Sequence, residues 1–415
     1  MHLLFLSSLL PDGVATTGFE IANAAIISAY RRQGVRLTVA GFRRDSARPA
    51  EDGEIDLGTI VLENAAATAR QKALWLFGAL SSGRTVSAEK LARHSRSGLM
   101  RRLAEAGPVD GYVLNSVQMP IAYPFLATDK PAIFVAHNVE HRSAEENAAN
   151  AADPLNRLLY GREARILRRE ETRICRQAAV IHTLSGDDRA GLGLAGDHRA
   201  VPLALSIGRD GKIADDGKRH QDVGLIGTWS WAPNRVGLDW FLEKVVPLLP
   251  AGVTVAIAGR MDGPPPQVPA NVRFVGRVPD AQGFVRASRV VALATKGGTG
   301  VQLKTIETFE EGLPAVATRA ALRGIDAVPE NVRVADEPRA FADGIAELVA
   351  AERAGGALRL DGARFADRQR AALDAGITRG LAIFAAAAGT SSVTMLPDSA
   401  RTPAPSEVAE RISCS

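Results

Sequence analysis

Cysteine is scarce in this sequence, which contains only Cys175 and Cys414 among its 415 residues. Two cysteines exclude a disulfide framework or a cysteine zinc site, and they are typical of a protein of the reducing cytosol. Long apolar runs are lacking as well, because none approaches the roughly 20 residues that a membrane-spanning helix requires. The sequence therefore predicts a cytoplasmic protein without a membrane span.

Lysine is also rare, since it supplies only eight of the 50 basic residues and arginine supplies the others. The net charge of +4 and the pI near 9.2 make the chain mildly basic. This balance is compatible with anionic substrates or an anionic membrane surface, and it is too weak to indicate nucleic-acid binding. A hydrophobic share of 46% and a charged share of 23% are typical of a globular protein. The length predicts two domains and a tail.

Short apolar runs alternate with helical patterns along the chain, which predicts an α/β fold of parallel sheets flanked by helices. In the first half the expected strands are 3–7, 37–41, 111–114, 132–136, 180–184 and 199–203. The expected helices are 19–33, a region around 68–106, and 154–177. In the second half we expect strands at 223–227, 253–258, 272–275, 290–294, 315–318 and 332–334, with helices at 234–249, 341–353 and 365–388.

The same alternation divides the chain into parts. We expect a first domain at 1–207, a charged, glycine-rich linker at 208–220 and a second domain at 221–360. A C-terminal helix at 361–388 then crosses back to the first domain, and a disordered tail rich in Ser, Thr, Pro and Ala follows at 389–415. Two similar halves joined by one linker predict a ligand-binding cleft between them.

The most informative stretch runs from Thr295 to Glu307 and reads TKGGTGVQLKTIE. It lies between an apolar run and a helical pattern, so a glycine-rich turn joins a strand to a helix. Such a turn directs backbone N–H groups and a helix N-terminus at an anion, usually a phosphate. Lys304 and Glu307 share one helix face and would place a cation for phosphate beside a carboxylate for sugar hydroxyls. The pattern predicts a nucleotide-sugar site.

Plainer interpretations of the glycine turns remain open. A Gly-Gly turn between strand and helix occurs in many α/β proteins, and Leu303 holds the third glycine position of the dinucleotide fingerprint. A second turn starts at Gly227 and leads to Asn234, which we expect to be the N-cap of the next helix. This second turn has two interpretations. In one, Trp229 is a packing residue and Gly227 forms a plain turn. In the other, Gly227 approaches the same phosphates as the first turn, from the opposite side.

His137, Asn138, Glu140 and His141 follow the expected strand at 132–136. Their H-x-x-E-H spacing matches the inverted zinc-protease pattern, which needs both histidines on one helix face. His137 instead lies at the carboxyl end of a strand, where α/β folds place ligand-binding loops. A core or capping histidine is a further alternative. We interpret the group as a polar cluster facing the cleft, and we expect no metal site.

The helix expected at 154–177 carries seven arginines among several leucines. A helix of this composition can lie on an anionic membrane surface. Its three glutamates dilute the charge, which also fits a solvated face of the domain. Both interpretations stay open at this point.

Three motifs, in this order, resemble the donor domain of GT-B glycosyltransferases, close to glycosyltransferase family 4 and related bacterial polysaccharide-biosynthesis sugar transferases. The first is GTWSWAPN at 227–234 with Trp240 and Phe241, and the second is FVGRV at 274–278. The third and most specific is Gly298-Thr299-Gly300 with Lys304 and Glu307, followed by GLPAVAT at 312–318. The first half of the chain is similar only in layout and in His137-Asn138-x-Glu140.

The resemblance implies two Rossmann-like domains facing each other across a cleft, with the nucleotide-sugar donor on the second domain and the acceptor on the first. It places Glu307 on the ribose hydroxyls and His137 opposite the donor sugar. The other implied donor-binding residues are Gly227, Trp229, Arg277, Val278, Gly298, Thr299, Gly300 and Lys304. Gly18, Asn138 and Glu140 are expected on the first domain's wall. His137 and Lys304 are the candidate catalytic residues.

The resemblance further implies a retaining glycosyltransferase that moves a sugar from a nucleotide diphosphate to a saccharide or lipid-linked acceptor in bacterial envelope or exopolysaccharide synthesis. It implies neither a metal nor another cofactor, and a cytoplasmic location compatible with the inner face of the membrane. Two alternatives remain: a non-catalytic GT-B protein that binds nucleotide sugar or glycan, and a zinc hydrolase that uses His137, Glu140 and His141.

Two features depart from the common family pattern. Thr299 stands where the first of two glutamates is usual, which leaves open how the hydroxyls of the donor sugar are held. The Lys-Gly pair expected after the Gly227 turn is also missing. Arg235 is a candidate to replace that lysine, and Lys304 is the other.

Overall fold

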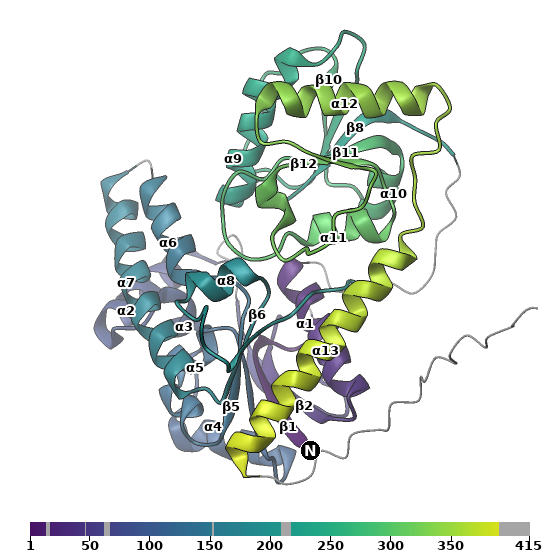
Figure 1. Cartoon of the computed structure of the whole chain (residues 1–415). Helices are drawn as coiled ribbons and strands as arrows, with labels where there is room; N and C mark the ends of the chain where they lie inside the picture. The colour runs from purple at the N-terminus through teal and green to yellow at the C-terminus, as the bar shows by residue number, and fades with distance from the viewer. Residues whose placement is uncertain (14–16, 46, 62–66, 152, 209–216, 390–415) are drawn as a thin grey trace, which may run out of the picture.

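The structure is a computed structural model, and it describes residues 1–13, 17–45, 47–61, 67–151, 153–208 and 217–389. It contains two α/β domains, the first at the bottom of Figure 1 and the second at the top. Most of the expected linker at 208–220 and the expected disordered tail beyond 389 lie outside the described residues.

The first domain is built on one sheet of parallel strands. Its strands are β1 (His2–Leu9), β2 (Arg36–Arg43), β3 (Glu54–Thr59), β4 (Gly111–Asn115), β5 (Ala132–Ala136), β6 (Val180–Thr183) and β7 (Ala200–Pro202). Its α-helices are α1 (Gly18–Arg32), α2 (Ala69–Ser82), α3 (Val86–Leu91), α4 (Arg96–Leu103), α5 (Gln118–Ala122), α6 (Glu140–Ala149), α7 (Pro154–Gln177) and α8 (Gly186–Gly191). The 3-10 helices η2 (Ala104–Ala106) and η3 (Pro124–Ala127) complete it.

The second domain repeats this plan with a smaller parallel sheet. Its strands are β8 (Gln221–Ile226), β9 (Val255–Ala258), β10 (Val272–Gly276), β11 (Ser288–Leu293), β12 (Ala315–Ala317) and β13 (Val332–Val334). Its helices are α9 (Ala232–Trp240), the π-helix η4 (Phe241–Val245), η5 (Val246–Leu248), α10 (Ala281–Arg286), α11 (Leu303–Glu310), η6 (Arg319–Leu322) and α12 (Pro338–Arg353). The long helix α13 (Ala363–Ala388) ends the described chain.

Strand order explains where a ligand would bind. The first sheet runs β3-β2-β1-β4-β5-β6-β7 and the second runs β10-β9-β8-β11-β12-β13. In each sheet the order reverses direction beside the first strand, between β1 and β4 and between β8 and β11. Ligands of doubly wound folds bind at the carboxyl ends of the strands near such a reversal. The expected fold, two Rossmann-like α/β domains, is confirmed.

Three local details differ from the sequence analysis or refine it. The strand β3 was missed because its pattern, Glu-Ile-Asp-Leu-Gly-Thr, carries only two buried apolar residues. The region around 68–106, expected to be helical, contains the three helices α2, α3 and α4. The helix expected at 234–249 leaves the α-conformation after Trp240, because Pro247 has no N–H to continue the α-helical bonding.

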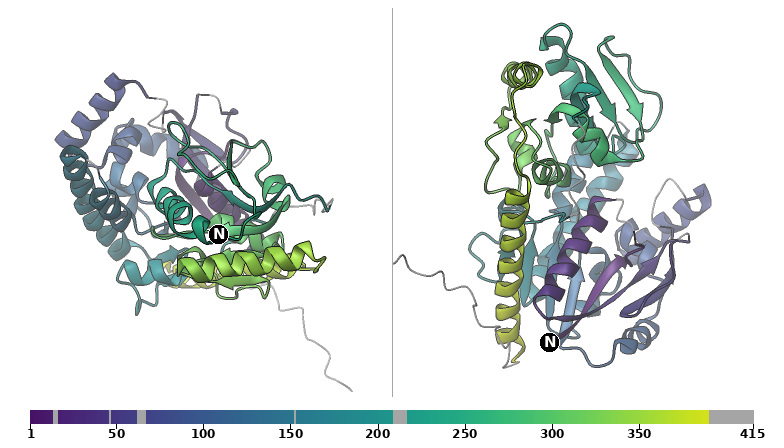
Figure 2. Two further views of the ribbon diagram at one scale, coloured as in Figure 1. Left: turned by 90° about the horizontal axis from the view of Figure 1, so that it is seen from above. Right: turned by 90° about the vertical axis from the view of Figure 1, so that its right-hand side faces the viewer.

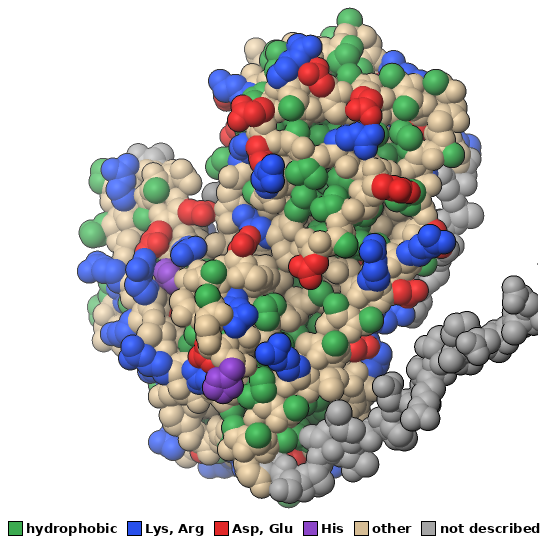
Figure 3. Space-filling view, viewed as in Figure 1, with side chains coloured by type: hydrophobic (Ala, Val, Ile, Leu, Met, Phe, Trp, Pro, Cys, Tyr) green, Lys and Arg blue, Asp and Glu red, His purple; other side chains and the backbone are tan. Residues whose placement is uncertain are grey.

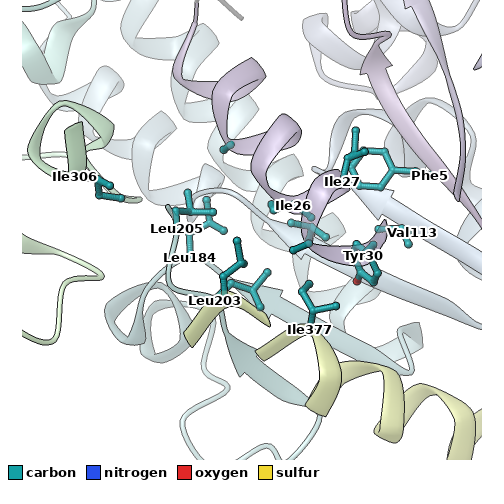
Figure 4. Packing of buried hydrophobic residues seen from close by; sticks show 14 of the residues in the cluster. Phe5, Ile26, Ile27, Tyr30, Val113, Leu184, Leu203, Leu205, Ile306 and Ile377 are labelled. Atoms are coloured by element: carbon teal, nitrogen blue, oxygen red, sulfur yellow. The ribbon is translucent and has the colours of Figure 1, made fainter. Parts of the chain in front are cut away.

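Helix α13 leaves the second domain and runs along the first, where it packs against α1, β6 and β7 (Figure 2). Its buried residues Leu373, Ile377 and Phe384 belong to one hydrophobic cluster that also contains Ile26 of α1 and Ile306 of α11. Figure 4 shows Ile377 among side chains of the first domain, with Ile306 at the far edge of the same cluster. The core is therefore continuous from one domain to the other.

Among the described residues, α13 is also the one helix long and apolar enough to cross a membrane by length and composition. The sequence had suggested no such segment. Its apolar residues Leu373, Leu381 and Phe384 are buried against the protein. One side of the helix is therefore packed against the protein, and 39% of its apolar window is buried.

Candidate functional site

The carboxyl edges of the two sheets meet at two loops. The loop after β11 carries Gly298, Thr299 and Gly300, and the loop after β5 carries His137 and Asn138. A Cβ atom placed on Gly300 would lie 2.0 Å from Asn138 Oδ1 and 3.0 Å from the carbonyl oxygen of His137. Gly300 also has a φ of 75°, so both its conformation and its surroundings require glycine. The two domains are in close contact at this point.

Backbone N–H groups of the glycine-rich loop bind carboxylates from the opposite domain. Gly298 N–H donates to Glu146 Oε2 on α6 at 3.0 Å, and Gly300 N–H donates to Asp188 Oδ1 on α8 at 3.0 Å. Burial raises the pKa of the Asp188 carboxyl, an effect opposed by hydrogen bonds from Ser185 and Gly300. N–H groups that donate to these carboxylate oxygens can by their chemistry also donate to other anionic oxygens.

The rest of the loop is held by Arg323 and by Ser143. Arg323 Nε donates to the carbonyl oxygen of Gly300 at 3.1 Å, and its Nη2 donates to that of Gly297 at 3.0 Å. Thr299 Oγ1 lies 2.8 Å from Ser143 Oγ across the cleft. Two carbonyl oxygens of the loop thus face Arg323, while the N–H groups of Gly298 and Gly300 face the first domain.

Lys304 and Glu307 lie on α11, which begins directly after this loop. Lys304 Nζ donates to Asn234 Oδ1 at 3.3 Å and lies 5.9 Å from the centroid of the Trp229 ring. Burial lowers the pKa of the Lys304 ammonium to about 8. Glu307 is partly buried one helical turn further along. A cation and a carboxylate thus follow the anion site on one helix, as the sequence predicted.

The Gly227 loop lies beside Lys304 through Trp229, which is buried and donates from Nε1 to the carbonyl oxygen of Ala258 at 2.9 Å. Gly227 N–H also donates to Ala258, at 3.2 Å. The Gly227 N–H is thus used inside the domain, so this glycine can offer a phosphate close approach but no donor. Trp229 packs in the core and also lies beside Lys304.

The sequence predicted that Asn234 is the N-cap of α9, and this prediction is wrong. Trp231 occupies that position, and Pro233 lies in the first turn. Asn234 instead donates to the carbonyl oxygen of Thr228 and accepts from Lys304. Arg235, the other candidate cation, forms an ion pair with Asp239 at 2.8 Å. Lys304 is therefore the better placed cation.

Arg277 and Val278 follow β10 at the same edge of the second sheet. Arg277 is exposed and Val278 is partly buried. Gly276 is joined to the neighbouring loop by its carbonyl oxygen, which accepts from Gly259 N–H at 2.7 Å. In the described part of the chain no hydrogen bond joins Arg277 or Val278 to the glycine-rich loop. They follow the edge strand β10, which β9 and β8 separate from β11 and its glycine-rich loop.

His137 is fixed by a buried polar network in the first domain. His137 Nε2 lies 2.7 Å from Asn115 Oδ1, and Asn115 Nδ2 donates to Asn23 Oδ1 at 2.9 Å and to Ser7 Oγ at 3.2 Å. The His137 ring also lies 4.8 Å from the ring of Phe19. Burial lowers the pKa of His137 to about 4, so the ring is neutral at physiological pH. Only 7% of the residue is exposed, so less of it faces the cleft than expected.

Glu140 and His141 begin α6, and Glu171 of α7 binds this helix end. Glu171 accepts from the N–H groups of Glu140 and His141 at 2.8 and 3.1 Å, and it lies 2.6 Å from His141 Nδ1. Burial and the Glu171 carboxylate raise the pKa of Glu140 to about 7, while a hydrogen bond with Asn138 opposes that rise. His141 is therefore a structural residue of the α6–α7 pair.

The zinc arrangement is not assembled. His137 is bonded to Asn115 and His141 to Glu171, so the two rings are held by different partners. Among the described residues, no group of three or more His, Cys, Asp and Glu side chains could hold a metal ion. Gly18, at the start of α1, lies on the first wall as expected, where a Cβ atom would be 3.5 Å from Leu303 Cδ1.

Sequence reasoning missed several residues of the site. They come from distant segments and are Ser7, Asn23, Asn115, Ser143, Glu146, Asp188 and Arg323. Asn115 directly ends a buried strand, which is the position that drew attention to His137. That signal could have found Asn115. Nothing in the sequence connects Glu146 or Arg323 with the glycine-rich loop.

One known protein family matches the sequence of the second domain. Residues 220–351 match the family described as Glycosyl transferases group 1. This match covers the glycine-rich loop, Lys304 and Glu307. No match was found among curated proteins.

Solved structures resemble the whole described chain in fold. Sucrose-phosphate synthase from Thermosynechococcus elongatus is 15% identical, with a TM-score of 0.62 over 92% of this chain and 97% of that one. HepE from Anabaena, solved in complex with UDP, is 14% identical, with a TM-score of 0.55 over 92% and 100% of the two chains. WaaG, a glycosyltransferase involved in lipopolysaccharide biosynthesis, is 14% identical, with a TM-score of 0.53 over 92% and 99%.

These similarities establish the GT-B fold for this chain. The match to group 1 glycosyl transferases is confined to residues 220–351 of the second domain. The suspected resemblance to GT-B glycosyltransferases is thereby confirmed, and fold and family together support a glycosyltransferase.

Proposed function

We propose that this chain is a retaining glycosyltransferase that moves a sugar from a nucleotide diphosphate to a saccharide or lipid-linked acceptor in bacterial envelope or exopolysaccharide synthesis. The donor binds the second domain and the acceptor binds the first. The reaction uses no metal or other cofactor.

One observation carries the proposal. The N–H groups of Gly298 and Gly300 bind carboxylate oxygens in this structure, immediately before a helix that presents Lys304 and Glu307. An anion site, a cation and a carboxylate in this order suit a diphosphate and the hydroxyls of a sugar or ribose. The HepE structure, whose fold this chain shares, contains UDP, which supports a nucleotide as the ligand class.

The charges of the site suit the departure of a diphosphate. As the bond between sugar and phosphate breaks, negative charge grows on the leaving oxygen. N–H donors and an ammonium group directed at that oxygen stabilise the charge. We assign this role to the Lys304 ammonium and to the loop N–H groups, which the diphosphate would take over from Glu146 and Asp188. The phosphate side would then require no cation beyond those of the chain. His137 and Asn138 close the site from the first domain, next to Gly300.

A non-catalytic GT-B protein remains the second candidate. Thr299, at the position of the usual glutamate, hydrogen bonds to Ser143 of the opposite domain rather than carrying a carboxylate. Such a site could bind nucleotide sugar without transferring the sugar. The zinc hydrolase receives no support, because His137 and His141 are bound to different partners.

Binding and transfer assays with the full chain test the proposal. Calorimetry against UDP-, GDP- and ADP-sugars should find one donor that binds. That donor should then release its nucleotide faster when saccharide or lipid-linked acceptors are added, and EDTA should leave the rate unchanged. Binding without transfer would favour the non-catalytic protein. If none of the sugars bound more tightly to the wild type than to Lys304→Met, the proposed donor site would be wrong.

A further inference from the structure

Two helices of the first domain expose an unusual number of large apolar side chains. On α2 these are Leu74, Phe77 and Leu80, with 60%, 73% and 53% of each residue exposed. On α7 they are Leu155, Leu158 and Tyr160, with 65%, 65% and 41% exposed. These six residues, the α2/α7 patch, are nearly half of the 13 large hydrophobic residues that are exposed in the described part of the chain. Grouping of this kind marks an interaction surface.

The two helices are joined, so the patch is one surface. Arg162 Nη2 of α7 donates to the carbonyl oxygens of Ala79 at 2.5 Å and Arg84 at 3.0 Å. Leu80 is the neighbour of Ala79, and Leu158 lies one helical turn before Arg162. On α2, Trp75 and Ala79 are buried on the inner side of the helix. The opposite side of α2 therefore faces outward with its leucines and phenylalanine.

Basic side chains continue this surface along α7. A shallow surface depression on the helix is lined by five arginines: Arg165, Arg168, Arg169, Arg173 and Arg176. Arg157 lies beside Leu158, and Arg70 and Lys72 are exposed on α2. Figure 3 shows Lys and Arg side chains gathered down the edge of the first domain where α7 lies.

Acidic groups near the patch are already engaged. Glu145 pairs with Arg168, Glu170 pairs with Arg169 and Arg173, and Glu163 pairs with Arg162. Asp153 caps the N-terminus of α7. Arg157 and Arg165 donate to the carbonyl oxygens of Ala151 and Gly161, which leaves their positive charge uncompensated. The surface beside the apolar residues is consequently cationic.

We propose that the α2/α7 patch docks this protein on a membrane that contains anionic lipids. Exposed leucines and a phenylalanine on a surface flanked by arginines suit the boundary between acyl chains and anionic headgroups. A second copy of the chain fits less well, because two such surfaces face to face would bring arginines against arginines. The inference does not depend on catalytic activity. It would also place the first domain, where the proposed acceptor binds, at the membrane.

Vesicle sedimentation with the full chain tests this docking. We expect binding to vesicles with roughly one phosphatidylglycerol in three lipids to exceed binding to pure phosphatidylcholine vesicles by about tenfold. Phe77→Ser with Leu158→Ser should reduce binding to the anionic vesicles about tenfold, because the inserted apolar groups are lost. Arg165→Gln with Arg176→Gln should remove most of the preference for anionic lipid. A matched control is Val236→Ser with Val328→Ser, exposed residues outside the patch.

The control variant should bind vesicles like the wild type. Equal binding by the Phe77→Ser/Leu158→Ser variant and the wild type would overturn the proposal, as would a wild type that does not sediment with anionic vesicles. Sedimentation velocity without lipid separates the alternative occupant. A wild-type dimer that the Phe77→Ser/Leu158→Ser change turns into a monomer, with no vesicle binding, would show that the patch joins two copies of the chain.

Discussion

The two walls of the cleft are built in opposite ways. On the first domain, His137 is fixed by side chains of its own domain, through Asn115 to Asn23 and Ser7. On the second, the N–H groups of Gly298 and Gly300 find their acceptors across the cleft, on Glu146 and Asp188. The first wall can keep its geometry when the domains separate. The second must exchange its partners when a ligand enters.

This difference suggests a division of labour. A wall that is fixed before the ligand arrives suits the positioning of reacting groups, since preorganisation avoids rearrangement during the reaction. A wall of N–H donors and a cation suits binding, since it offers charge to whatever anion lies there. Turnover and donor affinity, measured on the same variants, separate these two roles.

The largest effect is expected for His137→Ala. If the first wall serves the reaction, turnover should fall about a hundred- to thousandfold. This is the usual cost of losing one hydrogen bond to the transition state in a site from which water is excluded. Affinity for the bare nucleotide should stay nearly unchanged, because the nucleotide belongs to the second wall. Since burial keeps the pKa of His137 near 4, the ring is neutral above about pH 5 and its contribution should not vary between about pH 6 and pH 9.

Asn115→Ala provides the comparison for His137. It removes the partner of the His137 ring but leaves the ring itself. A positioning role predicts a smaller loss of turnover than in His137→Ala, with nucleotide affinity again unchanged. Near-normal turnover in His137→Ala, together with a lowered melting temperature, would instead show a core histidine and refute the assignment of this wall.

The next effect is expected for Glu307→Ala. Loss of charge-assisted hydrogen bonds to ribose should weaken donor binding by on the order of 1.5–3 kcal/mol, or roughly ten- to 150-fold. The melting curve should stay close to that of the wild type, because Glu307 is only partly buried. Calorimetric titration of the nucleotide measures the change. Affinity within about twofold of the wild type would contradict the ribose role.

Sequence patterns predicted the second wall far better than the first. Gly298, Lys304 and Glu307 lie within one short strand–turn–helix segment, so local periodicity is enough to bring them together. The first wall is assembled from β1, α1, β4 and the loop after β5. Only the packing of a whole sheet brings Ser7, Asn23 and Asn115 to His137. For this reason the sequence could indicate His137 but not its partners.

The fold, like the second wall, was predictable where the pattern is local. Apolar runs alternating with helices predicted both parallel sheets, because the central strands are buried on both faces. The edge strand β3 was missed, since only two of its six residues are buried and the others break the apolar run. Contacts between domains, such as Glu146 with the glycine-rich loop, leave no mark in a single sequence.

A third prediction concerns the pH dependence of donor binding. Burial lowers the pKa of Lys304 to about 8, so its ammonium is charged below that pH and neutral above it. Affinity for a nucleoside diphosphate should therefore fall about tenfold between about pH 7 and pH 9. Lys304→Arg keeps the charge at both pH values and should remove most of this fall. A wild-type affinity that does not change with pH would exclude Lys304 from the diphosphate site.

The smallest effect is expected for Glu146→Gln, and here donor affinity should rise rather than fall. In the present structure the Glu146 carboxylate binds the Gly298 N–H group that a diphosphate would use. The carboxylate therefore competes with the donor and repels its charge. The amide of glutamine is a weaker, neutral acceptor, so the form in which residue 146 binds the Gly298 N–H group becomes less populated. The apparent donor affinity should therefore rise about two- to fivefold.

Glu145→Gln is the matched control for this change. Glu145 precedes Glu146 on α6 but pairs with Arg168 on the surface, away from the cleft. Glu145→Gln changes the net charge of the protein by the same amount as Glu146→Gln. A long-range electrostatic effect would therefore raise donor affinity in both variants. A rise confined to Glu146→Gln means that the second wall exchanges an internal carboxylate for the donor. Unchanged or weaker binding in Glu146→Gln would mean that the Gly298 N–H group is not part of the donor site, and the contrast between the two walls would then rest on Lys304 and Glu307 alone.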